Sequence, residues 1–386
     1  MNILAVTFDS ELAGGANRSF LMVISELRER YQHKIHVIIP NHGPIEKELQ
    51  NAEFDFECVE LKAVGVLLGN SPKRILSKAK ANWYALDHYV KARKYSKKAK
   101  AYGYDLVYIN CANNLFGCYV ARNLGIPYVW HFRGLFLPEL YYVYNQRKLY
   151  NDPSARIIAI STSMQESLPI DAGIRMKQIV MVHNGLPFSN VKLSKQEWDH
   201  GIHIVLCGRL FIGKGHLDAI RAIGELNNRG YDEVYLHIAG DISNVNHDYM
   251  NRLHRAIEFY KLGNHVIFEG QISDMAKFRE NMNIELMCSI CEPFGRVTVE
   301  GMRSGLIVIG ANTGGTIDII QDGYNGYLYQ QGNSVDLADK LQYVIDNKEE
   351  ALCVAKRAID FTKTHFTVEQ NVSAINLVLC EAVQKG

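Results

Sequence analysis

Several features that would assign the chain to a particular class are missing from its 386 residues. No apolar run reaches the roughly 18 residues needed to span a membrane. The first residues, MNILAVTF, lack a basic leader, and their apolar run is too short for a signal peptide. The eight cysteines are scattered, which predicts reduced thiols and not a disulfide framework. We therefore expect a cytoplasmic protein.

An excess of charge of one sign is also lacking, because 42 Lys and Arg residues nearly balance 41 Asp and Glu residues. Any attraction to nucleic acid or membranes must then come from local clusters. No Asp-x-Asp motif adjoins a predicted strand, and the 14 histidines show no metal-ligand spacing. A GxGxxG motif after the first strand is missing too, which argues against a dinucleotide-dependent oxidoreductase. We expect no metal, no cofactor and no nucleic-acid partner.

Short apolar runs rich in Val and Ile alternate with segments of helical period, a pattern typical of parallel sheets covered by helices. The runs predict strands at 2–8, 34–40, 106–110, 128–132 and 156–161, and again at 203–208, 233–240, 265–270, 284–290 and 306–311. A polar stretch, 183–201, separates the two sets. We predict two doubly wound α/β domains, 1–187 and 188–367, and a final helix within 368–386. Their strand C-termini are expected to face a common cleft.

The most informative segment is CEPFGRVTVEGMRSG at 291–305, which follows a predicted buried strand and opens an amphipathic helix. Glu292 and Glu300 flank a Pro-Phe-Gly turn, and the N–H groups at the helix start near Gly295 form an anion site. Carboxylates only accept hydrogen bonds, so they suit sugar hydroxyls. The segment predicts a ligand with phosphates and hydroxyls. The plainer interpretation is an acidic residue favoured by the helix dipole and a second, surface glutamate.

A second strand, glycine-rich loop and helix are predicted in HIVLCGRLFIGKGHLDAIRAI at 203–223. Arg209 and Lys214 lie in this loop, and both side chains are long enough to reach a diphosphate. The loop glycines have the spacing of a P-loop. However, Gly215 stands where a P-loop needs Ser or Thr to hold magnesium, so an NTPase is disfavoured.

Together these segments resemble glycosyltransferase family 4, whose members have the GT-B fold of two Rossmann-like domains. The matching elements run along nearly the whole chain: ELAGGANRS (11–19), HFRG (131–134), NG (184–185), GRL…KG (208–215), the Glu-x7-Glu of 292–300 and SGLIVIGANTGG (304–315). The resemblance implies a retaining, metal-independent transferase. It would move a hexosyl unit from a nucleotide-diphosphate sugar, such as a UDP- or GDP-hexose, to an acceptor hydroxyl.

The resemblance also implies roles for single residues. Arg209 and Lys214 would hold the donor diphosphate and offset charge on the leaving group. Glu292 would contact the donor sugar, Glu300 would take the ribose hydroxyls, and His131 would lie beside the transferred sugar. The remaining donor contacts would come from Gly14, Gly15, Ile272 in the loop 270–273, Phe294, Gly295, Arg296 and Val297.

The chain departs from the family pattern at three positions. Gly301 stands where an Ala usually follows the second glutamate, Arg303 replaces a small residue, and Ile307 replaces a common Pro. These changes leave the donor chemistry intact, but they affect local packing and bear on the choice of sugar.

Other interpretations stay open beside this one. A GT-B nucleotide-sugar epimerase would share the fold and base site without needing an acceptor. A non-catalytic nucleotide-sugar or polymer-binding module would keep the loop cations without turnover, although the two carboxylates argue against it. Cys288 and Cys291 form a CxxC with no second pair, so ordinary strand cysteines are favoured over a metal or redox site. His131, judged without the family, is equally well a structural histidine.

The segment 73–100 carries ten Lys or Arg residues against one acidic residue, Asp87, interleaved with large apolar side chains. This composition is typical of a stretch that lies on anionic lipid, and a solvated face is an equal alternative. The aromatic-rich run 135–150 would help to receive a lipid-linked acceptor, or it belongs to the core. We expect peripheral contact with the cytoplasmic face of a membrane, a saccharide or lipid-linked saccharide acceptor, and a role in bacterial surface polysaccharide or glycolipid synthesis.

Overall fold

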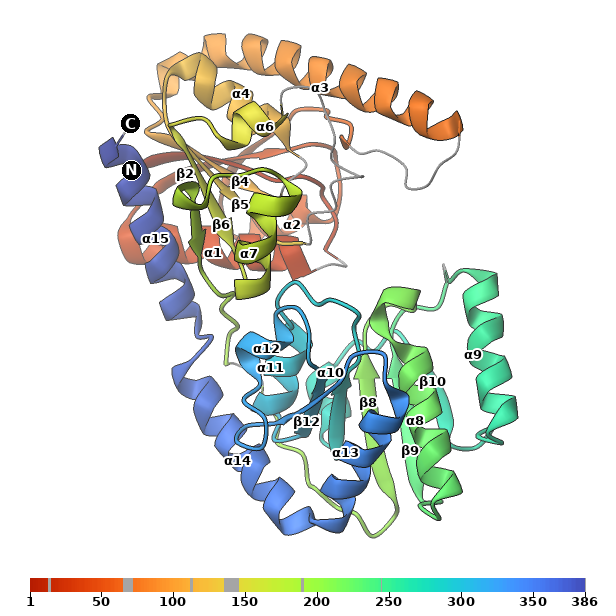
Figure 1. Ribbon diagram of the computed structural model, residues 1–386. Coiled ribbons are helices and arrows are strands. Elements are labelled where there is room, and N and C mark those ends of the chain that lie inside the picture. Colours follow the sequence, from red (N-terminus) through yellow and green to blue (C-terminus); the bar gives the residue numbers. More distant parts are fainter. Residues whose placement is uncertain are drawn as a thin grey trace. The chain divides into compact units, whose positions relative to one another are not determined.

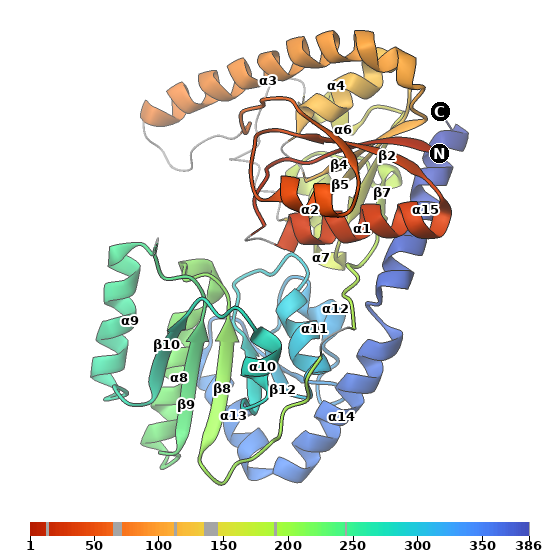
Figure 2. The same ribbon diagram turned by 180° about the vertical axis from the view of Figure 1, so that it is seen from behind.

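The computed structural model describes residues 1–12, 15–64, 72–111, 114–134, 146–188, 191–243 and 245–385 (Figures 1 and 2). The chain forms two compact units. Unit 1 comprises Met1–Gly185 and Val368–Gly386, and unit 2 comprises Leu186–Thr367. The last helix therefore returns to the unit in which the chain begins.

Unit 1 is built on a parallel sheet. Within the described residues it has seven strands in the order β3-β2-β1-β4-β5-β6-β7. Strands β4 and β5 are buried along their whole length, which explains their nearly continuous apolar sequences LVYIN and YVWH. The strands are β1 (Asn2–Val6), β2 (Lys34–Ile39), β3 (Asp55–Cys58), β4 (Leu106–Asn110), β5 (Tyr128–His131), β6 (Ala155–Ala159) and β7 (Ile179–Met181).

Helices of unit 1 bury one apolar face each against this sheet or against one another. A single hydrophobic cluster joins the sheet to α1 and α15; its helical members include Phe20, Val23, Ile24, Leu27, Val372, Ile375 and Leu379. Their spacing of three and four residues places them on one face of each helix. The helices are α1 (Gly15–Tyr31), α2 (Ile45–Asn51), α3 (Pro72–Ala99), α4 (Leu115–Leu124), α6 (Gln146–Tyr150), α7 (Thr162–Asp171) and α15 (Val368–Lys385).

Unit 2 repeats the architecture. Its described residues form a parallel sheet of six strands in the order β10-β9-β8-β11-β12-β13. The strands are β8 (Ile202–Cys207), β9 (Val234–Ala239), β10 (Val266–Gly270), β11 (Ile284–Met287), β12 (Ile307–Ala311) and β13 (Tyr327–Tyr329). The helices are α8 (His216–Asn228), α9 (His247–Phe259), α10 (Met275–Arg279), α11 (Arg296–Arg303), α12 (Thr316–Ile319), α13 (Ser334–Asp346) and α14 (Lys348–Thr364).

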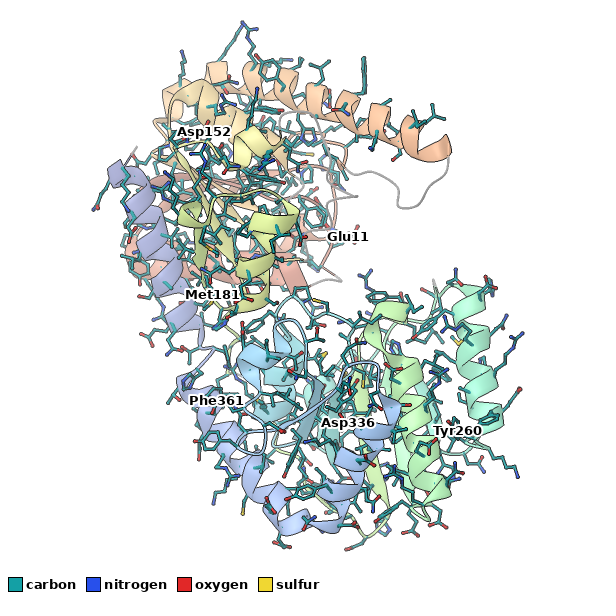
Figure 3. The ribbon with its side chains drawn as sticks, viewed as in Figure 1. Glu11, Asp152, Met181, Tyr260, Asp336 and Phe361 are labelled. Atoms are coloured by element: carbon teal, nitrogen blue, oxygen red, sulfur yellow. The ribbon has the colours of Figure 1, made fainter. Side chains whose placement is uncertain are left out.

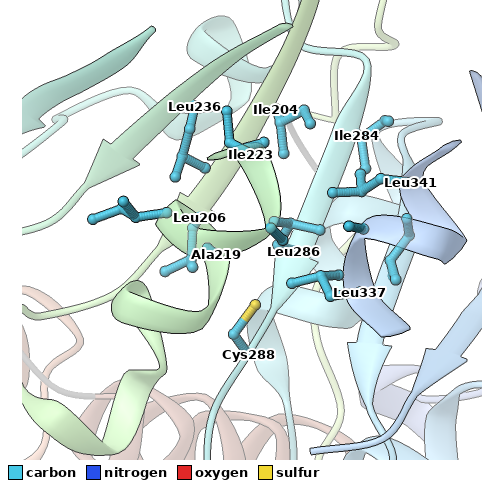
Figure 4. Close-up of a cluster of buried hydrophobic side chains, with 14 of the residues drawn as sticks. Ile204, Leu206, Ala219, Ile223, Leu236, Ile284, Leu286, Cys288, Leu337 and Leu341 are labelled. Carbon is cyan, nitrogen blue, oxygen red and sulfur yellow. The ribbon is translucent and has the colours of Figure 1, made fainter. Parts of the chain in front are cut away.

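The core of unit 2 lies between the central strands and two helices. Figure 4 shows Leu206 of β8 and Leu286 of β11 beside Ile223 of α8 and Leu337 of α13. Cys288, one residue beyond β11, closes the cluster at the strand end that carries the loops described below.

Both sheets contain the strand order 3-2-1-4-5-6 of a doubly wound fold, to which the sheet of unit 1 adds β7 as a seventh strand. This confirms the predicted α/β class and its two Rossmann-like sheets. In this order the direction of winding reverses between β1 and β4, and between β8 and β11. Ligands of such sheets bind beyond the carboxyl ends of the strands at this reversal. In unit 2 the position falls between the loops that follow β8 and β11.

Candidate functional site

The loops after β8 and β11 touch through their backbones. Gly215 has a left-handed φ of +71°, and a Cβ added there would lie 2.0 Å from the carbonyl oxygen of Cys288. The Ile290 N–H donates to the carbonyl of Gly213 over 2.9 Å. No side chain fits at Gly215, so the Ser or Thr of a P-loop has no room, and the NTPase interpretation fails on sterics.

Two of the predicted site residues meet across these loops. The Lys214 Nζ lies 2.7 Å from Glu292 Oε2, and the hydroxyl of Ser289 donates to the same oxygen over 2.9 Å. The side chains of Lys214 and Glu292 are only 21% and 14% exposed, so solvent screens this pair less than it screens a surface ion pair. An ammonium and a carboxylate are thereby fixed side by side at the strand reversal.

Arg209 lies at the start of the same loop and is exposed. The pKa of Asp241, in the loop after β9, is lowered mainly by hydrogen bonds from Ser243 and also by the charge of Arg209. The Arg209 guanidinium is thus within electrostatic reach of the neighbouring loop, with its side chain in solvent.

The start of α11 provides a second source of positive potential. Gly295 is the N-cap residue, with a φ of +107°, and no side chain caps the helix. The first N–H groups of a helix have no partner inside the helix, so the turn that contains Arg296 and Val297 suits an anion. The ring of Phe294 is buried and packs on Phe366 at a centroid distance of 5.5 Å. Only the backbone of Phe294 is therefore available to a ligand.

The loop after β12 packs against the backbone of the segment that contains Glu292. The Gly315 N–H donates to the carbonyl of Glu292 over 2.7 Å. A Cβ on Gly314 would lie 2.5 Å from the Glu292 carbonyl oxygen, and one on Gly315 would lie 2.6 Å from that of Phe294. The two glycines after β12 are therefore required by close backbone packing.

Glu300 belongs to a charged network on the next turn of α11. Its Oε2 accepts a hydrogen bond from Arg279 over 3.3 Å, and its Oε1 lies 3.7 Å from Arg296. Arg279 also binds Glu285, which is fully buried on β11. The sequence analysis missed Arg279 and Glu285, although a glutamate within the apolar strand IELM is itself a signal.

Ile272, predicted to border the base, packs with Val297 against a small cluster formed by Val205, Cys207 and Leu306. The loop after β10 and the first turn of α11 therefore share one apolar support. Together with the contacts above, this support brings Arg209, Lys214, Glu292, Gly295 and Glu300 onto the loops and helix around one strand reversal.

The remaining predicted site residues belong to unit 1. His131 ends β5 and is fully buried; its Nδ1 lies 2.7 Å from the hydroxyl of Tyr108, which also accepts from Arg133. Its Nε2 has no hydrogen-bond partner among the described residues. Burial, and then the charge of Arg133, holds the pKa of His131 well below its usual value. Gly15 is the first residue of α1, and Gly14 lies outside the described residues.

The basic segment forms one long helix, α3. Its small residues Ala81, Ala85 and Ala92 are buried, and the helix packs on α4. Its large apolar side chains face outward: Ile75, Leu76, Trp83, Leu86 and Val90 are 74%, 72%, 69%, 54% and 57% exposed. Figure 3 shows side chains projecting from this helix along its length.

Two further structural findings concern membranes and metals. None of the described helices combines the length and apolar composition of a bilayer crossing. Within the described residues, no three His, Cys, Asp or Glu side chains are grouped so that they could hold a metal ion. Cys288 is buried, which raises the pKa of its thiol to about 12, so it lacks the thiolate character of a nucleophile. Of the aromatic-rich run, 135–145 lies outside the described residues.

Two protein-family models match the chain. Residues 13–189 match Glycosyltransferase Family 4, and residues 193–361 match Glycosyl transferases group 1. Between them these matches cover most of the sequence.

Curated relatives align over parts of the chain. The capsular polysaccharide biosynthesis glycosyltransferase CapM of Staphylococcus aureus is 24% identical over 208 residues, which are 50% of this chain and 52% of CapM. The N-acetyl-alpha-D-glucosaminyl L-malate synthase of Bacillus anthracis is 28% identical over 119 residues, 31% of each protein. The chain thus spans about half the length, or less, of these relatives.

Solved structures align over the whole chain. HepE of Anabaena, in complex with UDP, covers 99% of this chain and 100% of its own with a TM-score of 0.80 at 23% identity. The alignment with a glycosyltransferase from Rickettsia africae covers 100% of this chain and 99% of that protein, with a TM-score of 0.80 at 20% identity. The alignment with WaaG, a glycosyltransferase involved in lipopolysaccharide biosynthesis, covers 97% of this chain and 99% of WaaG, with a TM-score of 0.68 at 14% identity. These likenesses show that the fold is GT-B.

Proposed function

The chain belongs to the glycosyltransferases of group 1 and family 4, and from this premise we propose that it moves a hexosyl unit from a nucleotide-diphosphate sugar to an acceptor hydroxyl. One observation carries the proposal: the Lys214–Glu292 pair lies at the strand reversal of unit 2, where the uncapped start of α11 also lies. Phosphate-binding and hydroxyl-binding groups are therefore adjacent.

The proposed chemistry follows from the charges at this site. As the bond from the anomeric carbon to the diphosphate oxygen breaks, negative charge grows on the diphosphate and positive charge on the sugar ring. Arg209, Lys214 and the N–H groups of α11 supply fixed positive potential at the leaving group. The acceptor oxygen then bonds to the anomeric carbon and gives its proton to water, with the configuration retained as in the family. Because these cations offset the leaving-group charge, we propose a metal-independent transfer.

The hydroxyl-binding groups divide between sugar and nucleotide in this proposal. Glu292 accepts from the donor sugar, and its present partner Lys214 turns to the diphosphate. Glu300 accepts from the ribose. His131, whose buried Nε2 has no partner among the described residues, would lie beside the transferred sugar. HepE has been solved with UDP and with UDP-glucose, which supports UDP as the first nucleotide to test.

We further propose a lipid-linked saccharide acceptor and a position on the cytoplasmic face of an anionic membrane. The outward-facing apolar residues of α3, followed by Arg93, Lys94 and Lys97, support this part. Apolar side chains beside cations are the composition that binds an anionic lipid surface. The names of CapM and WaaG, which refer to capsular polysaccharide and lipopolysaccharide, agree with an acceptor of this kind.

The test begins with a thermal-shift screen of UDP, GDP and ADP and their hexoses, because a ligand of the native state raises the unfolding midpoint. Release of the nucleoside diphosphate is then measured with and without a polyprenyl-phosphate-linked saccharide. Release that requires the acceptor supports transfer, and it should persist in EDTA. An altered nucleotide sugar formed without acceptor would instead identify an epimerase, and binding without turnover a non-catalytic module. Activity that EDTA abolishes and manganese restores would overturn the metal-independent part.

A further inference from the structure

Arg279 and Glu285 form a buried ion pair under α11. Arg279 donates through Nε to Glu285 Oε2 over 2.8 Å and through Nη2 to Glu285 Oε1 over 3.0 Å, a two-armed geometry. The side chain of Arg279 is 4% exposed and that of Glu285 is 0% exposed. Burial works against the charge of Arg279, but the neighbouring Glu285 carboxylate outweighs it and raises the pKa of Arg279, so the guanidinium stays charged.

Stability alone does not explain this pair. The cost of removing two charges from water consumes most or all of their attraction, and apolar replacements of similar volume are often as stable. The other residues of β11, Ile284, Leu286 and Met287, are apolar and buried. An apolar side chain at position 285 would continue that pattern, so the glutamate points to a use beyond packing.

Gly301 of α11 leaves room for the Glu285 side chain of the Arg279–Glu285 pair. A Cβ on Gly301 would lie 2.4 Å from Glu285 Oε2 and 3.2 Å from Glu285 Cβ. The alanine that usually follows the second glutamate in this family is therefore sterically excluded here. Glu285 therefore requires a glycine at position 301.

A further contact of Arg279, to Glu300, suggests what the Arg279–Glu285 pair does. Its Nη2 also donates to Glu300 Oε2 over 3.3 Å, while the Glu300 side chain remains 34% exposed. We propose that Arg279, held in place by Glu285, is a positioning residue that aims the Glu300 carboxylate at the ribose of the donor nucleotide. This inference rests on the proposed function and adds the residues that orient the ribose acceptor.

The test compares ribonucleotides with their 2′-deoxy forms. Wild-type protein should bind UDP, or whichever of UDP, GDP and ADP the screen selects, about 10-fold or more tightly than the 2′-deoxy nucleotide, because a charge-assisted hydrogen bond is lost. The variant Arg279→Met with Glu285→Leu keeps an apolar core of similar volume. This double variant should bind the ribonucleotide and the 2′-deoxy nucleotide equally, with the affinity that the wild type has for the 2′-deoxy nucleotide. Its donor KM should rise by the same factor with kcat unchanged.

Controls separate positioning from a general loss of structure. Asp360→Leu with Lys363→Met removes an exposed ion pair of α14 and should keep the discrimination. Glu300→Gln should lose it, and adding the pair replacement to that variant should change nothing more. Arg279→Lys keeps a charge beside Glu285 but not the second arm, so it should lose part of the discrimination even if the double variant does not fold.

Two results would overturn the inference. One is a folded double variant, or a folded Arg279→Lys, that still prefers the ribonucleotide as the wild type does. The other is a wild type that binds both forms equally. If the wild type binds no nucleotide or nucleotide sugar, the proposed function itself fails, which is a distinguishable outcome.

Discussion

At the scale of single residues, Lys214 is the cation whose surroundings are most informative. Its ammonium is paired with Glu292, so a donor diphosphate must draw it away from a carboxylate only 2.7 Å distant. Lys214→Ala and Arg209→Ala should each lower kcat/KM for the donor about 10–150-fold, the value of a charge-assisted contact. Steady-state kinetics with Lys340→Ala, a surface lysine of α13, provide the control. Wild-type kinetics in both folded variants would refute the diphosphate assignment.

The two carboxylates should differ in kinetics. Glu300→Ala would remove the proposed ribose contact, which should be equal in ground and transition states, so the donor KM should rise with kcat nearly unchanged. Glu292→Ala would remove the proposed contact to the reacting sugar, and it also leaves Lys214 without its carboxylate partner, so kcat should fall as well. Measuring kcat and KM separately for both variants checks this difference. Equal effects confined to KM would contradict it.

What the sequence predicted at this scale depended on local signals. The loop cations and glutamates stand in segments whose glycines and helix starts are visible in the sequence. Arg279 was missed because it meets Glu285 and Glu300 only through the packing of α10 on β11 and α11, which no local spacing records. The surroundings of His131 likewise depend on Tyr108 and Arg133, which lie 23 and two positions away in the sequence and meet at one hydroxyl only in the fold.

At the scale of elements, α3 is unusual because five of its large apolar side chains face outward, whereas Ala81, Ala85 and Ala92 face the protein. The protein should co-sediment with anionic liposomes at low salt, less so at high salt, and not with neutral liposomes. Replacing Arg93, Lys94 and Lys97 with Glu, or Trp83 with Ser, should weaken binding. Lys98 is left in place because it is bound to Glu57 at 2.6 Å.

A matched charge change tests whether this binding is local to α3. Replacing Lys356, Lys363 and Lys385 with Glu alters the net charge equally outside α3 and should leave liposome binding unchanged. If the wild type ignores anionic liposomes at low salt, α3 is a solvated face, and the lipid-linked acceptor loses its main support.

Burial separated the strands that were predictable from those that were not. All ten predicted strands occur, because buried parallel strands have apolar runs, and even the four-residue strands β5 and β11 are buried along their whole length. The strands that were missed, β3, β7 and β13, have four, three and three residues and lie at sheet edges. Such short runs at an edge carry too little period to distinguish a strand from a loop.

At the scale of the whole molecule, buried histidines should make stability depend on pH. Burial lowers the pKa of His88 and of His216 to about 4, and that of His131 well below its usual value. In the unfolded chain these histidines bind a proton near pH 6.5, whereas in the folded protein they stay neutral down to about pH 4. The free energy of unfolding is therefore highest above pH 6.5 and falls as the pH is lowered toward 4. Each histidine contributes up to about 1.4 kcal/mol per unit of pH in this window.

Urea unfolding at pH 7.5, 6.5 and 5.5 measures this dependence. The unfolding midpoint should fall with pH, and His88→Gln should make the fall less steep. His42→Gln serves as a control, because its side chain is 79% exposed. A midpoint that rises on acidification would show that carboxylates such as Asp218, whose pKa is raised by burial, outweigh the histidines.

The return of α15 to unit 1 also sets an order of events during translation. Unit 2 is one uninterrupted segment whose ends lie together, since the Leu186 N–H donates to the carbonyl of Phe366 over 2.9 Å. A ribosome that has released Thr367 has delivered everything unit 2 needs, whereas unit 1 still lacks Val372, Ile375 and Leu379 of its core. The part of the chain made first is therefore the last to be finished. Until α15 is in place, the apolar face of unit 1 that it covers remains open to chaperones.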